Sequence, residues 1–137
     1  MNEALLAAYR ASDYRVRLRH HRWASIRIDH PLPETLRPLV GTQPWGFITA
    51  WNPYSQPTSC FTNRQAQHRL LAALRRQSAI LVIRAAVGVG QAGWREPSLF
   101  VTGADIGVLD TLMRACRQNA YVHGDGVHLA RLRVLAA

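Results

Sequence analysis

The spacing of hydrophobic residues along the chain predicts both helices and strands. Three segments carry apolar side chains at helical intervals, as Leu70 and Leu74 do in the second of them. Thr58 or Ser59 precedes that segment and can cap its first turn. These intervals predict helices over residues 2–11, 60–77 and 105–117, together with one or two helical turns between prolines over residues 34–40.

Seven further segments have the pattern of strands. In the first of them Tyr14, Val16 and Leu18 alternate with arginines, which is the two-residue period of a half-buried strand. The run WGFITAW is rich in aromatic and β-branched side chains and ends at Asn52, before a proline. The strands are predicted over residues 14–19, 23–28, 45–51, 79–87, 98–102, 120–123 and 127–134.

Helices separated by pairs of strands predict an α+β fold. Gly124-Asp125-Gly126 is a typical hairpin turn between the last two strands, and short connections of this kind favour antiparallel pairing. We expect a mostly antiparallel sheet with the helices packed on one face, one layer of helices on one layer of sheet. Asn119 is expected to end the last helix in a left-handed conformation.

Length and composition indicate one ordered domain. The chain has 137 residues, of which 48% are hydrophobic, and we assign a single domain over residues 1–137. Its longest apolar stretch is interrupted by Arg84 and is far shorter than the ~20 residues of a membrane-spanning helix. Because the first residues lack the basic region of a signal peptide, we expect a cytoplasmic protein in which Cys60 and Cys116 are free thiols.

The charge of the chain is strongly positive. Seventeen basic residues stand against eight acidic ones, which gives a net charge of +9, and all seventeen are arginines. Guanidinium groups suit phosphate and carboxylate recognition, but a GC-rich genome also favours arginine over lysine. That bias does not explain the excess of basic over acidic residues, so a polyanionic partner stays open.

Arginines are densest near the N-terminus. Arg15, Arg17 and Arg19 are expected to project from one face of the first strand, ~6.5 Å apart, because each residue of a strand rises by ~3.3 Å. Together with Arg22 they would form a stripe that contacts the phosphates of a nucleic acid. The alternative is a solvated, charged edge strand that resists pairing with another sheet.

The known catalytic and cofactor motifs lead to no assignment. Residues 88–93 match G-x-G-x-x-G, but a strand is predicted to follow them, so we expect an exposed, mobile loop that binds no dinucleotide. No cofactor and no metal are predicted, because His20 and His21 point to opposite faces of a strand and Cys116 lies on an apolar helix face. G-x-S-x-G and the lysine of a P-loop are both absent from the sequence, so no enzyme class is indicated.

Asn63 gives the strongest local signal. On its predicted helix it lies close to the line of the core residues, where an amide is unfavourable unless it is hydrogen-bonded. We expect Asn63 to be buried and bonded to the backbone of residues 52–56. Arg64, ~100° further round the helix, is expected to form an ion pair with Glu96. This centre is either a structural tether or a polar pocket.

Several short motifs share their order and spacing with a known family. They are F-I-T-A-W-N-P, N-R, W-x-E-x-S and Q-N-A, in this order along the chain. With this set the chain resembles a family of short bacterial proteins known only as a domain of unknown function. The resemblance implies a bacterial cytoplasmic protein and brings no activity, cofactor or partner with it. It marks as motif positions Trp51, Asn52, Asn63, Arg64, Glu96, Ser98, Gln118 and Asn119.

Three classes of function follow from the sequence. The amide-rich motif positions favour a binding module for a small polar or anionic ligand in the region of Asn52, Asn63, Arg64 and Glu96. A nucleic-acid-binding protein that uses the arginine-rich strand is one alternative, and an enzyme of unknown class, built on Glu96 or on a histidine, is another. One basic face would favour nucleic acid, whereas scattered charge with a polar cleft would favour a small ligand.

Overall fold

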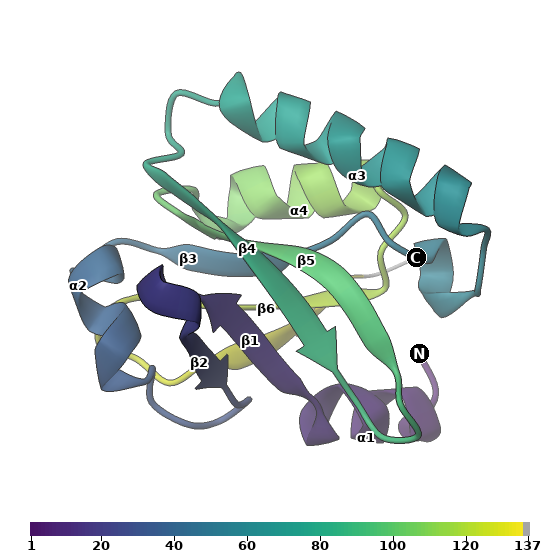
Figure 1. Cartoon of the computed structure of the whole chain (residues 1–137), viewed down its shortest axis with the longest axis horizontal. Helices are drawn as coiled ribbons and strands as arrows, with labels where there is room; N and C mark the ends of the chain where they lie inside the picture. Colours follow the sequence, from purple (N-terminus) through teal and green to yellow (C-terminus); the bar gives the residue numbers. More distant parts are fainter. Residues whose placement is uncertain (136–137) are drawn as a thin grey trace.

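Seven strands form one antiparallel sheet in the computed structural model, which describes residues 1–135 (Figure 1). Their order across the sheet is β2-β1-β4-β5-β3-β6-β7, and every neighbouring pair is antiparallel. The strands are β1 (Asp13–Arg17), β2 (Trp23–Ile26), β3 (Trp45–Ile48), β4 (Val82–Val89), β5 (Arg95–Thr102), β6 (Ala120–Gly124) and β7 (Arg131–Val134). The helices are α1 (Glu3–Ala11), α2 (Arg37–Val40), α3 (Cys60–Arg75) and α4 (Ile106–Ala115), with 3₁₀ turns η1 (Arg19–His21), η2 (Glu34–Leu36) and η3 (Pro53–Ser55). The predicted α+β fold, an antiparallel sheet with helices packed on one face, is confirmed.

The two faces of the sheet carry separate core clusters, because successive residues of a strand point to opposite faces. Phe47 of β3 pairs with Phe100 of β5, and both side chains pack into one cluster. The next residues, Ile48 and Val101, belong to the other cluster together with Leu109 of α4. The central strands are therefore buried on both faces.

Helices α3 and α4 cover one face of the sheet (Figure 1). They bury Leu70, Leu74, Leu109 and Met113 against it. Gly46 of β3 allows α4 to come close, since a Cβ there would lie 2.7 Å from a methyl carbon of Leu109. On the opposite face the sheet curls, and β1, β2 and α2 enclose the second cluster.

The glycine-rich segment is shorter as a loop than predicted. β4 continues through Gly88 to Val89, and β5 begins at Arg95. Gly88 is buried, and the exposed connection covers residues 91–94 rather than 88–93. The segment does join two strands, as predicted.

Other element boundaries also differ from the prediction. β5 contains Pro97, which the strand tolerates because β3 pairs with β5 only from Leu99 onward. The left-handed residue after α4 is Arg117, with φ 55°, and not Asn119. The last connection is longer than a tight hairpin turn, since β7 begins only at Arg131. The ends of the remaining elements shift by a few residues.

Candidate functional site

A cavity of about 540 Å³ opens between α1, the turn that joins β4 to β5, and the loop that follows β3. Figure 1 shows α1 beside the β4–β5 turn, so two segments far apart in sequence form its walls. α1 contributes an apolar wall that includes Leu5 and Ala8, and the turn contributes Gly90 and Trp94. The polar side chains in the lining are Tyr9, Ser12, Asn52, Ser55, Gln91, Glu96 and Gln118.

The loop after β3 has a strained backbone where it meets this cavity. Asn52, Tyr54 and Ser55 have positive φ values of 47°, 54° and 59°. Residues with a side chain adopt this region at an energetic cost, and they keep it only where neighbouring groups hold them there. Because Asn52 and Ser55 line the cavity, the strained loop forms one of its walls.

Asn63 of α3 holds this loop in place. Its Oδ1 accepts a hydrogen bond from the backbone N–H of Asn52 at 2.8 Å, and its Nδ2 donates to Asn52 Oδ1, also at 2.8 Å. A longer bond of 3.4 Å runs from Nδ2 to the backbone oxygen of Thr58. Asn63 is only 2% exposed. The prediction of a buried Asn63 bonded to this loop is confirmed.

Two further amides hold the loop from the chain that follows α4. Gln118 Nε2 donates to the backbone oxygen of Trp51 at 3.1 Å. Asn119 Nδ2 donates to Ser55 Oγ at 3.1 Å. The motif positions that meet at this loop are Trp51, Asn52, Asn63, Gln118 and Asn119.

Sequence reasoning missed Gln67. Its Oε1 accepts from the backbone N–H of Ala50 at 2.8 Å, and its Nε2 donates to the backbone oxygen of Pro97 at 3.4 Å. Thr49 Oγ1 donates to the same Pro97 oxygen at 2.8 Å. Gln67 follows Asn63 by one helical turn and lies on the same face of α3. The four-residue spacing from Asn63 could have indicated that Gln67 also faces the sheet.

Glu96 lies on another wall of the cavity. Its side chain is partly buried and also borders an inner space of about 30 Å³, which Ser98 lines as well. Ser98 Oγ donates to the backbone oxygen of Glu96 at 3.1 Å. Within residues 1–135 the Glu96 carboxyl has no hydrogen-bond or ion-pair partner, and burial raises its pKa to about 8. Burial alone therefore favours the protonated form at neutral pH, whereas a cation bound beside the group would favour the carboxylate.

Two tyrosines adjoin this carboxyl. Tyr9 OH lies 3.5 Å from Ser55 Oγ, and Tyr14 OH donates to the backbone oxygen of Tyr9. Burial raises the pKa of both hydroxyls, and the charge of Glu96 adds to each rise. Both tyrosines therefore present neutral hydroxyls near the carboxyl.

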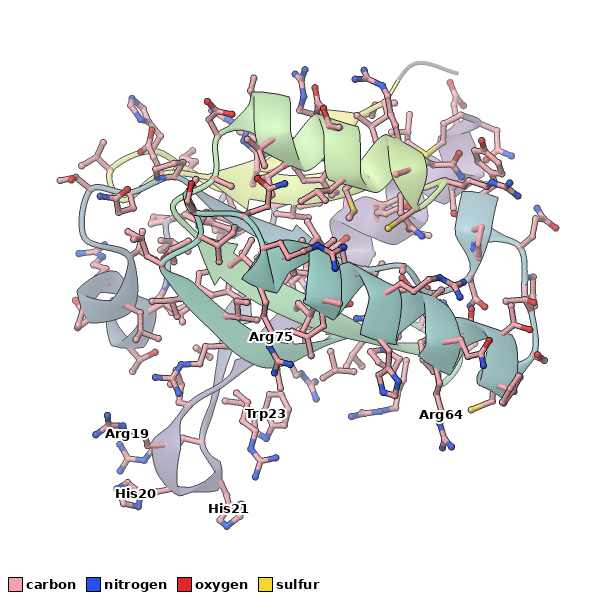
Figure 2. The ribbon with its side chains drawn as sticks, turned by 90° about the horizontal axis from the view of Figure 1, so that it is seen from above. Arg19, His20, His21, Trp23, Arg64 and Arg75 are labelled. Carbon is pink, nitrogen blue, oxygen red and sulfur yellow. The ribbon has the colours of Figure 1, made fainter. Side chains whose placement is uncertain are left out.

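The predicted ion pair between Arg64 and Glu96 is wrong. Arg64 is exposed and projects away from the body of the molecule (Figure 2), whereas Glu96 faces the cavity. Asn63 occupies the sheet-facing position of α3, so the next residue, ~100° further round, points to solvent. Arg64 is therefore not part of this site.

The predicted arginine stripe forms only in part. β1 ends at Arg17, so Arg15 and Arg17 share a strand face, whereas Arg19 belongs to the following turn. Arg15 is paired with Asp13 at 3.4 Å. Arg17, Arg19 and Arg22 are exposed.

The remaining chemistry of the chain is spread out. Cys60 and Cys116 are free cysteines, as predicted. Among residues 1–135, histidine, cysteine and carboxylate side chains form no group of three that could hold a metal ion. In the same part of the chain, every helix is too short or too polar to cross a membrane.

Comparisons with known proteins match the chain to a family but assign it no activity. A family model described as "Protein of unknown function (DUF3293)" matches residues 48–121, more than half of the chain. The matched segment contains the loop after β3, α3, Glu96 and the two amides that follow α4. It agrees with the resemblance to a family of unknown function. No curated protein and no solved structure matches the chain.

Proposed function

The chain belongs to this family of proteins of unknown function, and we propose that it is a binding module for a small ligand that carries a protonated amine beside an apolar group. The observation that carries the proposal is the carboxyl of Glu96, which borders the 540 Å³ cavity and has no protein partner within residues 1–135. A ligand that supplies the missing partner would offset the cost of burying this group.

The size and lining of the cavity support a small ligand. Small-molecule sites have volumes of ~300–1,000 Å³ and combine apolar walls with a few placed polar groups. Leu5, Ala8 and Trp94 supply apolar wall here, and Glu96 lies among neutral hydroxyls and amides. Among residues 1–135, neither an arginine nor a histidine lines the cavity. A cationic or neutral ligand is therefore favoured over the anionic one that the sequence also allowed.

The hydroxyls of the cavity support binding rather than catalysis. Ser12 Oγ donates to the backbone oxygen of Ala8 at 2.7 Å, and Ser55 Oγ accepts from Asn119 at 3.1 Å. A nucleophilic serine needs an adjacent base, such as histidine, to take its proton. These two serines are instead engaged in holding α1 and the loop after β3.

Nuclear magnetic resonance titration with two matched probes tests the proposal. Phenethylamine and 3-phenylpropanoate share a phenyl ring and a two-carbon spacer but carry opposite charges. At pH 7 we expect phenethylamine to shift the indole resonance of Trp94 and the amide resonance of Gly90. Glu96→Gln should weaken its binding by tenfold or more, since a charge-assisted hydrogen bond contributes ~1.5–3 kcal/mol.

Glu34→Gln is the matched control, because Glu34 is exposed and lies outside the cavity lining. It should bind phenethylamine as the parent protein does. Equal binding of 3-phenylpropanoate, or unchanged phenethylamine binding by Glu96→Gln, would refute the proposed role of the carboxyl. A set of shifted resonances away from Trp94 and Gly90 would refute the cavity as the site.

A further inference from the structure

The turn between β1 and β2 projects from the body of the molecule and carries only basic and aromatic side chains at its tip. His20 and His21 both have φ 59°, which gives the turn the two positive φ values of a type I′ hairpin. Arg22 N donates to the backbone oxygen of Arg19 at 3.3 Å and closes the turn. Figure 2 shows Arg19, His20 and His21 pointing outward from this tip.

Acidic residues are missing from the sequence around this surface. Residues 14–28, which include the whole hairpin beyond Asp13, contain no aspartate or glutamate. Neither do residues 35–95, which include all of α3 and β4. The carboxylate of Asp13, at the start of β1, is already paired with Arg15 and Arg27 at 3.4 and 2.6 Å. The positive charge of the hairpin tip is therefore not neutralised locally.

An aromatic ring lies beside these charges. Trp23 is 47% exposed and pairs in register with Arg17, so the two side chains are cross-strand neighbours on one sheet face. Ala85 of β4 is also exposed, which means that α3 leaves this part of the sheet uncovered. Figure 2 shows Trp23, Arg75 and Arg64 projecting to the same side of the molecule as the hairpin tip.

We infer that this surface binds single-stranded nucleic acid. We call it the hairpin surface and define it as Arg17, Arg19, His20, His21, Arg22 and Trp23. Exposed bases stack on aromatic rings whatever their identity, and arginines beside the ring contact the phosphates between them. The hairpin surface combines both elements, and it is separate from the cavity proposed above for a small ligand.

Fluorescence anisotropy with a fluorescein-labelled 12-nucleotide oligo(dT) tests the inference across a series of salt concentrations. Each phosphate contact contributes about −0.7 to the slope of log K against log salt for a single strand. Arg19→Ser should therefore weaken binding and reduce the slope by about 0.7. Trp23→Ala should weaken binding at least fivefold at every salt concentration and leave the slope unchanged, because stacking contributes ~1–3 kcal/mol per base.

Arg114→Ser is the matched control, since it removes one exposed arginine from α4, outside the hairpin surface. It should leave affinity and slope nearly as they are. An equal loss in Arg114→Ser and Arg19→Ser would show attraction by net charge alone and overturn the inference. So would an unchanged affinity in Trp23→Ala. Binding to phosphatidylserine vesicles, but not to oligo(dT), would assign the surface to a membrane and overturn it as well.

Discussion

Replacement of Asn63 by alanine tests whether the loop after β3 depends on α3. The change removes the acceptor for the backbone N–H of Asn52 and the donor for its side-chain oxygen, both at 2.8 Å. A buried donor left unpaired costs ~1–3 kcal/mol, and the lost amide pair adds ~1 kcal/mol. Relaxation of Asn52 from its positive φ returns part of this cost. We expect Asn63→Ala to lower the free energy of unfolding by about 2–3 kcal/mol.

Urea denaturation followed by tryptophan fluorescence at pH 7 measures this loss. With an m-value of ~2 kcal/mol/M, the midpoint should fall by about 1 M or slightly more. Arg64→Ala is the matched control on the neighbouring exposed residue and should stay within ~0.5 kcal/mol of the parent protein. The tether is refuted if Asn63→Ala unfolds within ~0.5 kcal/mol of the parent, or if Arg64→Ala costs as much.

Three other changes give measurable results. Glu96→Gln should match the parent protein near pH 4 and exceed its free energy of unfolding by more than ~1 kcal/mol at pH 9. The folded protein keeps the proton of Glu96 up to about pH 8, whereas the unfolded chain loses it at a lower pH. The parent protein therefore loses stability as the pH rises between these two values. Urea titrations that find the same stability difference between variant and parent at every pH would contradict this. The double variant His20→Asn, His21→Gly should be more stable by about 1 kcal/mol, because asparagine and glycine suit the positive φ values, and its melting temperature should rise by a few degrees. A lower melting temperature would contradict this. The hydrogen bonds from Arg133 hold the pKa of Asp110 at about 2. Asp110→Asn should therefore lower the free energy of unfolding by about 2 kcal/mol at pH 7. Calorimetry should find that this loss shrinks as the pH falls from 4 towards 2.

The fold was predictable because its strands repeat a simple pattern. Residues Trp45–Ile48 are apolar at every position, and this is the pattern of a strand buried on both faces. The predicted start of β5, at residue 98, is wrong because the prediction placed Pro97 outside the strand. A proline normally ends a strand, but here β5 has no β3 partner at that position, and Thr49 and Gln67 bond the proline's oxygen instead.

The candidate site was predictable only where the signal is local. Asn63 stands out because an amide on a core stripe needs partners, and its loop is close by in the sequence. The ion pair of Arg64 with Glu96 failed for a different reason. Glu96 faces a cavity closed by α1, and the packing of the first helix against a turn about ninety residues later leaves no periodic signal in the sequence.

Side-chain amides hold the loop after β3, so the hydrogen bonds that shape this wall of the cavity do not depend on the charged group that faces it. Asn63, Gln118 and Asn119 do not titrate, so their hydrogen bonds keep the same donors and acceptors from acid to alkaline pH. Glu96 faces the same space and changes its charge near pH 8. The charge of the cavity lining therefore depends on pH, whereas the hydrogen-bonded frame of its wall does not.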